Sequence, residues 1–179
     1  MEHIYFDLMA FPDDKTEIAL WQESFKDTQG WDRIYKYILE DGLIHGLNEL
    51  IATNYEIFPI GDDEVKLALS IRNQDKAIVG FVICQEFNIK TTSPELFLQY
   101  IVIRPDMQNK GIGKFVFKHL PDEVGKLTGK KPVSAFSYIH NTNLASQKLY
   151  TSCGFSFEIM TNSADYVRAR GNFQEELVK

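Results

Sequence analysis

Residues 99–114, with the sequence QYIVIRPDMQNKGIGK, decide which fold this chain adopts. An apolar run typical of a buried strand leads into a loop that contains Gly111 and Gly113, and a pattern of helical period follows. Glycine lets the backbone approach a ligand closely, and the first N–H groups of a helix have no partner inside the helix. Together with the positive end of the helix dipole, this predicts a phosphate-binding site, to which Lys114 adds a charge.

The glycines do not match two other phosphate-binding patterns. No Gly-Lys-Ser/Thr sequence follows the required gap, so the loop is not a P-loop. Val116 occupies the position where a dinucleotide-binding fingerprint has Gly or Ala. A structural turn without a ligand is the alternative interpretation of this segment taken alone.

The composition of the chain excludes several classes of protein. The chain has 179 residues, a formal net charge of −6 and 44% hydrophobic residues, which predicts one domain over residues 1–179. Two cysteines and four scattered histidines predict neither a disulfide framework nor a metal site. No apolar run reaches the roughly 18 residues of a membrane span, and the first residues lack a signal-peptide pattern, so we expect a cytoplasmic protein. The acidic total without a Lys/Arg block argues against nucleic-acid binding.

The pattern on either side of the decisive segment is mixed. We expect a mixed, mostly antiparallel sheet with helices on both faces, an α/β (α+β) fold. Pro121 should kink or end the helix that begins at Gly111. The expected strands are 4–8, 65–71, 77–87, 96–103, 133–139, 155–160 and 166–170, and the expected helices are 14–25, 32–51 with a break at 41–42, 111 onward, and 143–152.

A second motif lies at residues 143–155, NLASQKLYTSCGF. The pair Gln108-x-x-Gly111-x-Gly113 and Asn143-x-x-Ser146-x-x-Leu149-Tyr150-x-x-x-Gly154-Phe155 resembles the GCN5-related N-acetyltransferases (the GNAT superfamily). The resemblance covers residues 62–160 well and the N-terminal third only by element order. It implies a GNAT-like fold and acetyl-CoA as acyl-donor cosubstrate, without a metal.

The resemblance also implies roles for particular residues. Tyr150 matches the tyrosine near the thioester sulfur, and Ser146 stands where the family usually has Ala. The family often places a Glu that acts as general base near position 97, where this chain has Phe97. The nearby acids Glu86 and Glu95 are the catalytic candidates that we name. Tyr138, and His140 by way of water, are further candidates for the base, whose identity stays open. The residues implied to bind acetyl-CoA are Ile101, Val102, Ile103, Gln108, Asn109, Lys110, Gly111, Ile112, Gly113, Lys114, Asn143 and Ser146.

The implied activity is direct transfer of the acetyl group from acetyl-CoA to a primary amine. The alternative is an acyl-CoA-binding sensor or interaction module without catalysis, favoured by the missing acid near position 97. Residues 1–60 carry a net charge of −8 and residues 104–179 carry +4. This asymmetry predicts a cationic acceptor, such as a small amine or a basic peptide, although capping and solvated helix residues explain the same charges. Analogy with the family predicts a homodimer.

Overall fold

The computed structural model describes residues 3–9, 16–17, 57–61, 64–87, 90–161 and 163–173. The helices predicted at 14–25 and 32–51 lie outside these ranges, except for a helical pair at residues 16–17. No helix in the described ranges is long and apolar enough to cross a bilayer.

The strands form a mixed sheet of the predicted class. Their order is β1-β3-β4-β5-β6-β8-β7, and β2 pairs with β3. The pairs β1/β3, β6/β8 and β7/β8 are antiparallel, whereas β5/β6 is parallel. The strands are β1 (Tyr5–Leu8), β2 (Ile57–Gly61), β3 (Glu64–Arg72), β4 (Ile78–Phe87), β5 (Glu95–Ile103), β6 (Ser134–His140), β7 (Ser156–Ile159) and β8 (Tyr166–Asn172).

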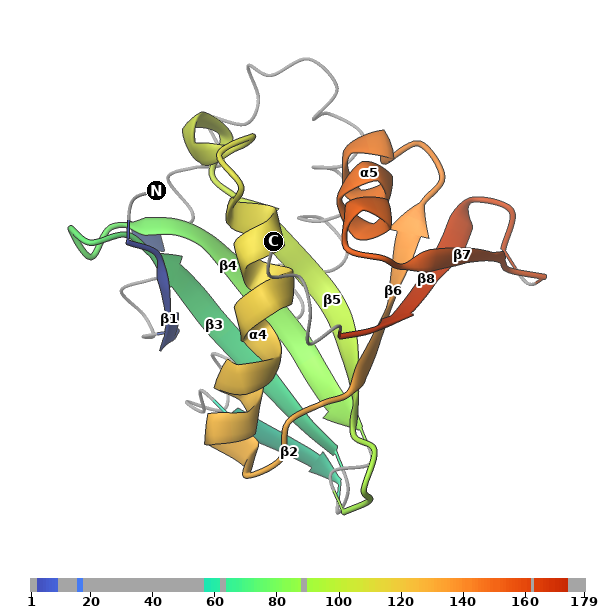
Figure 1. The fold of residues 1–179 in the computed structure, drawn as a ribbon, viewed down its shortest axis with the longest axis horizontal. Helices are drawn as coiled ribbons and strands as arrows, with labels where there is room; N and C mark the ends of the chain where they lie inside the picture. Colours follow the sequence, from blue (N-terminus) through green and yellow to red (C-terminus); the bar gives the residue numbers. More distant parts are fainter. Residues whose placement is uncertain are drawn as a thin grey trace. The chain divides into compact units, whose positions relative to one another are not determined.

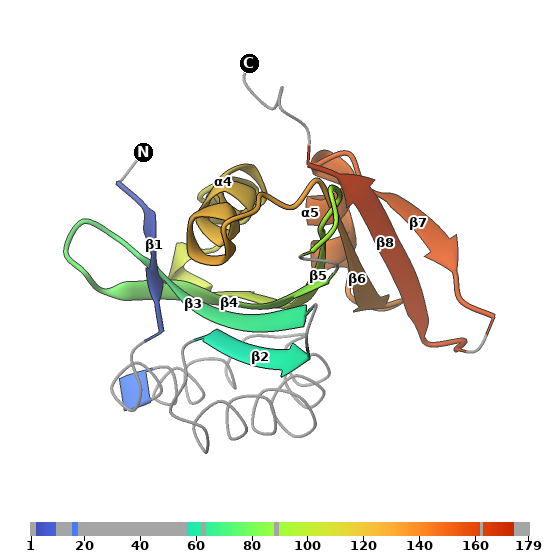
Figure 2. The same ribbon diagram turned by 90° about the horizontal axis from the view of Figure 1, so that it is seen from below.

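Two compact units make up the chain. The first holds Leu67–Ile83 and Tyr100–Lys110 together with the N-terminal part, and the second holds Cys84–Gln99 and Gly111–Lys179 together with Pro59–Lys66. In the first unit β1 lies beside β3 (Figure 2), with Tyr5 opposite Arg72 and Leu8 opposite Leu69. β4 and β5 approach each other closely there, since a Cβ on Gly80 would lie 2.6 Å from the Val102 carbonyl oxygen.

In the second unit β8 lies between β6 and β7, and helix α5 (Leu144–Ser152) lies beside β6 (Figure 1). The other helix of this unit, α4 (Ile112–Thr128), packs an aromatic core. The Phe117 ring contacts the rings of Tyr150 and Phe155 edge-on, with centroids 4.7 and 5.1 Å apart. Aromatic pairs favour this geometry because the positive ring edge meets the negative ring face.

Pro121 does not end α4, which is one of the two outcomes that the sequence predicts, because the helix runs without interruption from Ile112 to Thr128. A proline removes one hydrogen bond inside a helix. Pro121 is buried together with Val116, Leu120 and Val124 on one face of α4. Burial of that face therefore maintains the helix past the proline.

The strand β2 was not predicted, and neither was the short 3-10 helix η2 (Pro105–Met107) that follows β5. The other described strands and the helix α5 confirm the predicted elements to within two residues at most ends. Cys84 and Cys153 are both buried, and they form no disulfide.

Candidate functional site

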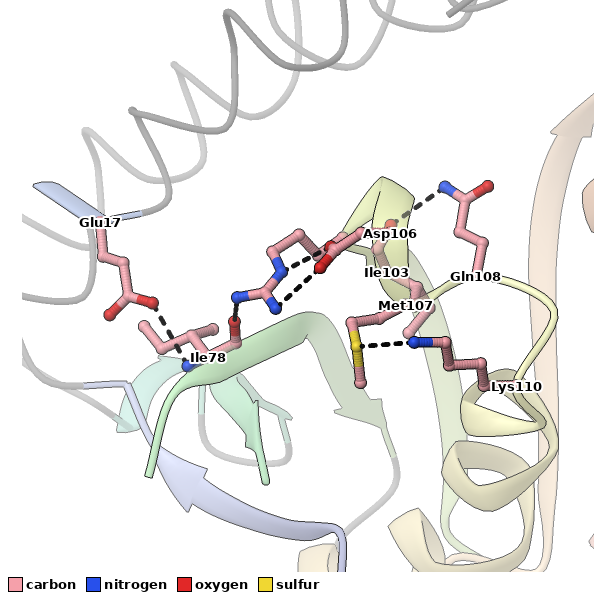
Figure 3. A network of polar contacts seen from close by, with 8 residues as sticks. Glu17, Ile78, Ile103, Asp106, Met107, Gln108 and Lys110 are labelled. Atoms are coloured by element: carbon pink, nitrogen blue, oxygen red, sulfur yellow. Dashed lines mark hydrogen bonds and ion pairs between the residues drawn. The ribbon is translucent and has the colours of Figure 1, made fainter. Parts of the chain in front are cut away.

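The loop after β5 is held in place by a bidentate ion pair (Figure 3). Arg104 donates from Nε and Nη2 to the two carboxylate oxygens of Asp106, at 2.7 and 3.0 Å, and from Nη1 to the Ile78 carbonyl. Hydrogen bonding from Arg104 lowers the pKa of Asp106, so the carboxylate stays ionised. Two parallel N–H···O bonds fix orientation as well as distance. The turn that leaves β5 is therefore rigid on the side facing β4.

Gln108 connects the far end of the same loop back to the end of β5. Its side-chain amide donates to the Ile103 carbonyl oxygen at 3.1 Å, and Lys110 Nζ lies 3.5 Å from the Met107 sulfur (Figure 3). Asn109 has a φ of 60°, in the left-handed region. Asparagine tolerates this region better than most residues do. The predicted phosphate loop therefore turns sharply at Asn109. The contacts of the Gln108 and Lys110 side chains hold the residues on either side of this turn in place.

Helix α4 begins without a capping side chain. Gly111 is its N-cap, with a φ of 85°, and no side chain in the described part of the chain bonds the first N–H groups. The N–H groups from Gly111 to Lys114, and those of Asn109 and Lys110 before them in the chain, donate to none of the described residues. A Cβ built on Gly111 would meet nothing within 4 Å. Open donors at the positive end of a helix dipole suit an anionic ligand, and a phosphate fits this donor set.

Gly113 is required for a different reason than the sequence suggests. A Cβ at this position would lie 2.8 Å from a Leu149 methyl carbon of α5. The glycine therefore lets α4 and α5 pack closely. Of the two glycines in the motif, Gly111 serves the turn and Gly113 serves helix packing. Lys114 and Lys118 are exposed on α4.

Asn143 caps α5. Its side-chain oxygen accepts from the Ser146 N–H at 3.1 Å. This is the usual role of an N-cap residue and fixes the side chain in one orientation. The remaining donor, the Asn143 amide nitrogen, bonds no described side chain, and the same is true of the Ser146 hydroxyl. The implied role of Asn143 in binding acetyl-CoA is compatible with this cap, since the amide hydrogens stay available.

Tyr150 lies inside the second unit, with 4% of its surface exposed. Its ring packs edge-on against Phe117 and Phe155. Burial raises the pKa of Tyr150 well above its ordinary value. Tyr150 therefore holds its proton throughout the neutral pH range, as a hydrogen-bond donor must.

The two acidic candidates are placed very differently. Glu95, at the start of β5, accepts from Arg170 at 3.0 Å and lies 3.4 Å from the Ser134 hydroxyl. Glu86 is fully buried, and neither of its carboxylate oxygens has a hydrogen-bond partner among the described residues. Burial raises the pKa of Glu86, while Thr128 at the end of α4 and Lys130 just beyond it lower that pKa. α4 rises about 25 Å from Gly111 to Thr128, so Glu86 lies far from the open N–H groups.

The sequence interpretation missed Ser137. This side chain is 4% exposed and donates to the Leu98 carbonyl oxygen at 2.7 Å. The alternation of β6 gave a signal, because Ala135, Ser137 and Ile139 share one buried face, and a polar side chain among apolar ones needs a partner. Within the described ranges, no three His, Cys, Asp or Glu side chains gather as a metal site requires.

The family of this chain follows from a comparison with known protein families. The family model "Acetyltransferase (GNAT) family" matches residues 19–155, so the chain belongs to the GNAT acetyltransferases. A search of curated protein sequences finds no match.

Solved structures share the fold at low sequence identity. A PaiA N-acetyltransferase from Thermoplasma acidophilum in complex with coenzyme A has a TM-score of 0.62 and 19% identity over 95% of this chain and 99% of its own. A ribosomal-protein alanine N-acetyltransferase from Escherichia coli has a TM-score of 0.57 and 17% identity, covering 99% and 100%. A spermidine N-acetyltransferase from Vibrio cholerae in complex with CoA and spermine has a TM-score of 0.54 and 16% identity, covering 94% and 95%.

Proposed function

We propose that this protein transfers the acetyl group of acetyl-CoA to a primary amine by direct attack, in the cytoplasm. The single observation that carries the proposal is the set of open N–H groups from Gly111 to Lys114 at an uncapped helix start. These groups would bind the pyrophosphate of acetyl-CoA. The exposed Lys114 and Lys118 add positive charge to the same helix.

The reaction needs the thioester carbonyl to be polarised. In the GNAT superfamily, a strand that splays from its neighbour leaves a backbone N–H free for this task, and the described ladder between β5 and β6 includes Glu95–Phe97 of β5. We assign this task to the backbone of Ile101, Val102 and Ile103. A preorganised donor of this kind is typically worth about 3 kcal/mol.

The amine attacks the carbonyl carbon, and the C–S bond breaks with its electron pair on sulfur. An amine with a pKa near 10.4 is about one part in a thousand free base at neutral pH, a penalty of about 4 kcal/mol. Glu95 is the candidate base that retains access to solvent, since its side chain is 17% exposed, and its ion pair with Arg170 must loosen for that role. Tyr150 donates a hydrogen bond to the leaving sulfur.

The acceptor that we propose is a small cationic amine or a basic peptide. The support is the charge of −8 over residues 1–60, which attracts a cation. The acceptors in the names of similar structures, spermidine and a ribosomal-protein alanine, belong to those proteins. They define the range of amines that an acceptor screen should include.

The test is release of free CoA thiol from acetyl-CoA in the presence of a panel of polyamines, aminoglycosides, amino acids and basic peptides. Mass spectrometry of the amine confirms a gain of one acetyl group. We expect at least one amine to raise CoA release above the rate without amine. Binding of acetyl-CoA without transfer to any amine would refute catalysis and support the second candidate.

That second candidate is an acyl-CoA-binding module without catalysis. It is favoured by the two acids: Glu95 is ion-paired with Arg170, and Glu86 is fully buried far from the open end of α4. Thermal shift with acetyl-CoA and with ATP tests both candidates against a general nucleotide binder. We expect acetyl-CoA, and not ATP, to stabilise the protein whether it is an acetyltransferase or an acyl-CoA-binding module.

A further inference from the structure

One arginine of the second unit, Arg168 in β8, has no polar partner among the described residues. Its Nε atom is buried without a hydrogen bond, and none of the ion pairs in the described ranges includes Arg168. Glu158 stands opposite Arg168 in the ladder between β7 and β8, yet no ion pair joins the two. Buried N–H donors nearly always have a partner, so Arg168 is a candidate for binding a group from outside the chain.

An aromatic ring, rather than a polar atom, holds this guanidinium in place. The central carbon of the Arg168 guanidinium lies 4.8 Å from the centroid of the Phe136 ring. Phe136 in turn stacks on Phe97, with centroids 5.0 Å apart, and meets the Tyr138 ring edge-on at 5.9 Å. A cation over a ring face is attracted by the ring and uses none of its N–H donors in that contact. The contact therefore positions the guanidinium and leaves its donors available to a ligand.

The same face of the sheet carries Glu95, the candidate base of the proposed reaction. Side chains alternate along a strand, so Arg168 and Arg170 share one face of β8. Arg170 donates to Glu95 at 3.0 Å, and Phe97, two residues after Glu95 in β5, stacks on Phe136 of the same face. At about 3.4 Å per residue, Arg168 lies about 7 Å beyond Arg170 along the sheet. A ligand with an amine at Glu95 therefore needs several bonds between that amine and a group at Arg168.

We infer that Arg168 binds a carboxylate of the acceptor, so that the acceptor is a basic amino acid or a short basic peptide rather than a polyamine. The inference rests on the proposed function and narrows the cationic acceptor named there. A planar guanidinium binds a carboxylate through two parallel N–H···O bonds, which fix the orientation of the bound molecule.

Free lysine has the chemistry that this face can bind. Its flexible side chain separates the ε-amine from the carboxylate, as the distance between Glu95 and Arg168 requires. The Tyr138 ring, with 44% of the residue exposed, offers apolar surface to the methylene groups of such a chain. Arg168 is then a specificity-determining residue, which selects the acceptor and moves no proton.

The test compares acceptors that differ only in a carboxylate. Cadaverine is lysine without its carboxylate, and the C-terminal amide of glycyl-lysine is that dipeptide without its negative charge. A preference in the first pair identifies a free amino acid as the acceptor, and a preference in the second pair alone identifies a peptide. Cadaverine carries more positive charge than lysine, so the general attraction by the acidic segment 1–60 works against the expected result.

We expect a kcat/KM about tenfold higher for the carboxylate member of at least one pair, the size of one hydrogen bond to a charged group. Arg168→Gln should remove this preference and change kcat/KM for the member without a carboxylate less than about twofold. Lys148→Gln makes the same change of net charge at an exposed position in α5 and should keep the full preference. An equal loss for both members of a pair in Arg168→Gln, or no preference in the wild type, overturns the inference.

A second variant covers the case in which Arg168→Gln does not fold, as judged by circular dichroism. Arg168→Lys keeps the positive charge but loses the planar fork. It should therefore retain only part of the preference for the carboxylate member. An unchanged preference in folded Arg168→Lys overturns the assignment of the carboxylate to this guanidinium.

Binding without turnover separates this inference from the proposed function. An NMR titration of the four compounds into the protein should show tighter binding of a carboxylate member, and Arg168→Gln should abolish the difference. That result in a protein that acetylates no amine refutes the proposed function and supports the carboxylate site. Equal binding of both members of each pair to the wild type overturns the carboxylate site, whether or not the protein is active.

Discussion

Replacing Gly111 by alanine separates the cost of backbone strain from the loss of a phosphate site. Gly111 has a φ of 85° and Gly129, at the other end of the same helix, has a φ of 83°. A Cβ at either position meets nothing within 4 Å. The two substitutions therefore carry the same strain and no steric clash, and they differ only in where they lie on α4.

The expected magnitudes follow from these values. A residue with a side chain in the left-handed region costs about 1 to 2 kcal/mol relative to glycine. For a protein of this size that lowers Tm by roughly 2 to 8 °C, and both variants should show it. Only Gly111→Ala should weaken acetyl-CoA binding, because its methyl group stands beside the open N–H groups of the helix start. One lost hydrogen bond to a charged group is worth about 1.5 to 3 kcal/mol, which is at least about a tenfold rise in Kd.

The assay is isothermal titration of acetyl-CoA into the wild-type protein and both variants, with circular dichroism to show that each is folded. Gly129→Ala should bind like the wild type. An equal Kd for Gly111→Ala and Gly129→Ala, with both folded, refutes the assignment of the phosphates to this loop.

Three further predictions concern the chemistry, the pH dependence and the acceptor. Tyr150→Phe should lower kcat on the order of 100-fold with a smaller change in the KM for acetyl-CoA, because the Tyr150 hydroxyl donates to the developing thiolate. A kcat within twofold of wild type would show that Tyr150 has a packing role only. Burial raises the pKa of Glu86 above its unfolded value, so the contribution of this carboxyl group to stability is present at acid pH and is lost as pH rises through the folded pKa. Glu86→Gln should therefore raise Tm more at pH 8 than at pH 4. An equal rise in Tm at both pH values would contradict this pH dependence. For a cationic acceptor, kcat/KM should fall as salt rises from 0.1 to 1 M and the Debye length shrinks from about 10 to 3 Å, whereas a flat profile denies the acidic segment 1–60 any role in attraction.

Local pattern alone predicted most of the described elements. The strands at 65–71 and 133–139, the helix after Gly111 and the helix at 143–152 each depend on residues close together in sequence. The phosphate loop could also be predicted, because an apolar strand, a glycine and a helix start are consecutive in the chain. The resemblance to the GNAT family, carried by two motifs, led to the class that the family model then confirmed.

Other features depend on residues far apart in the chain. Pro121 continues a helix because the buried face of α4 compensates for one missing hydrogen bond, and a single segment carries no information about that face. Gly113 is required by Leu149, and the ion pair of Glu95 is made with Arg170. Only packing could pair the Ser137 hydroxyl with the Leu98 carbonyl oxygen, because a hydroxyl has no fixed partner until separate segments come together. The sequence determined which backbone groups are open to a phosphate, and the tertiary structure determined which rings, those of Phe117 and Phe155, enclose Tyr150.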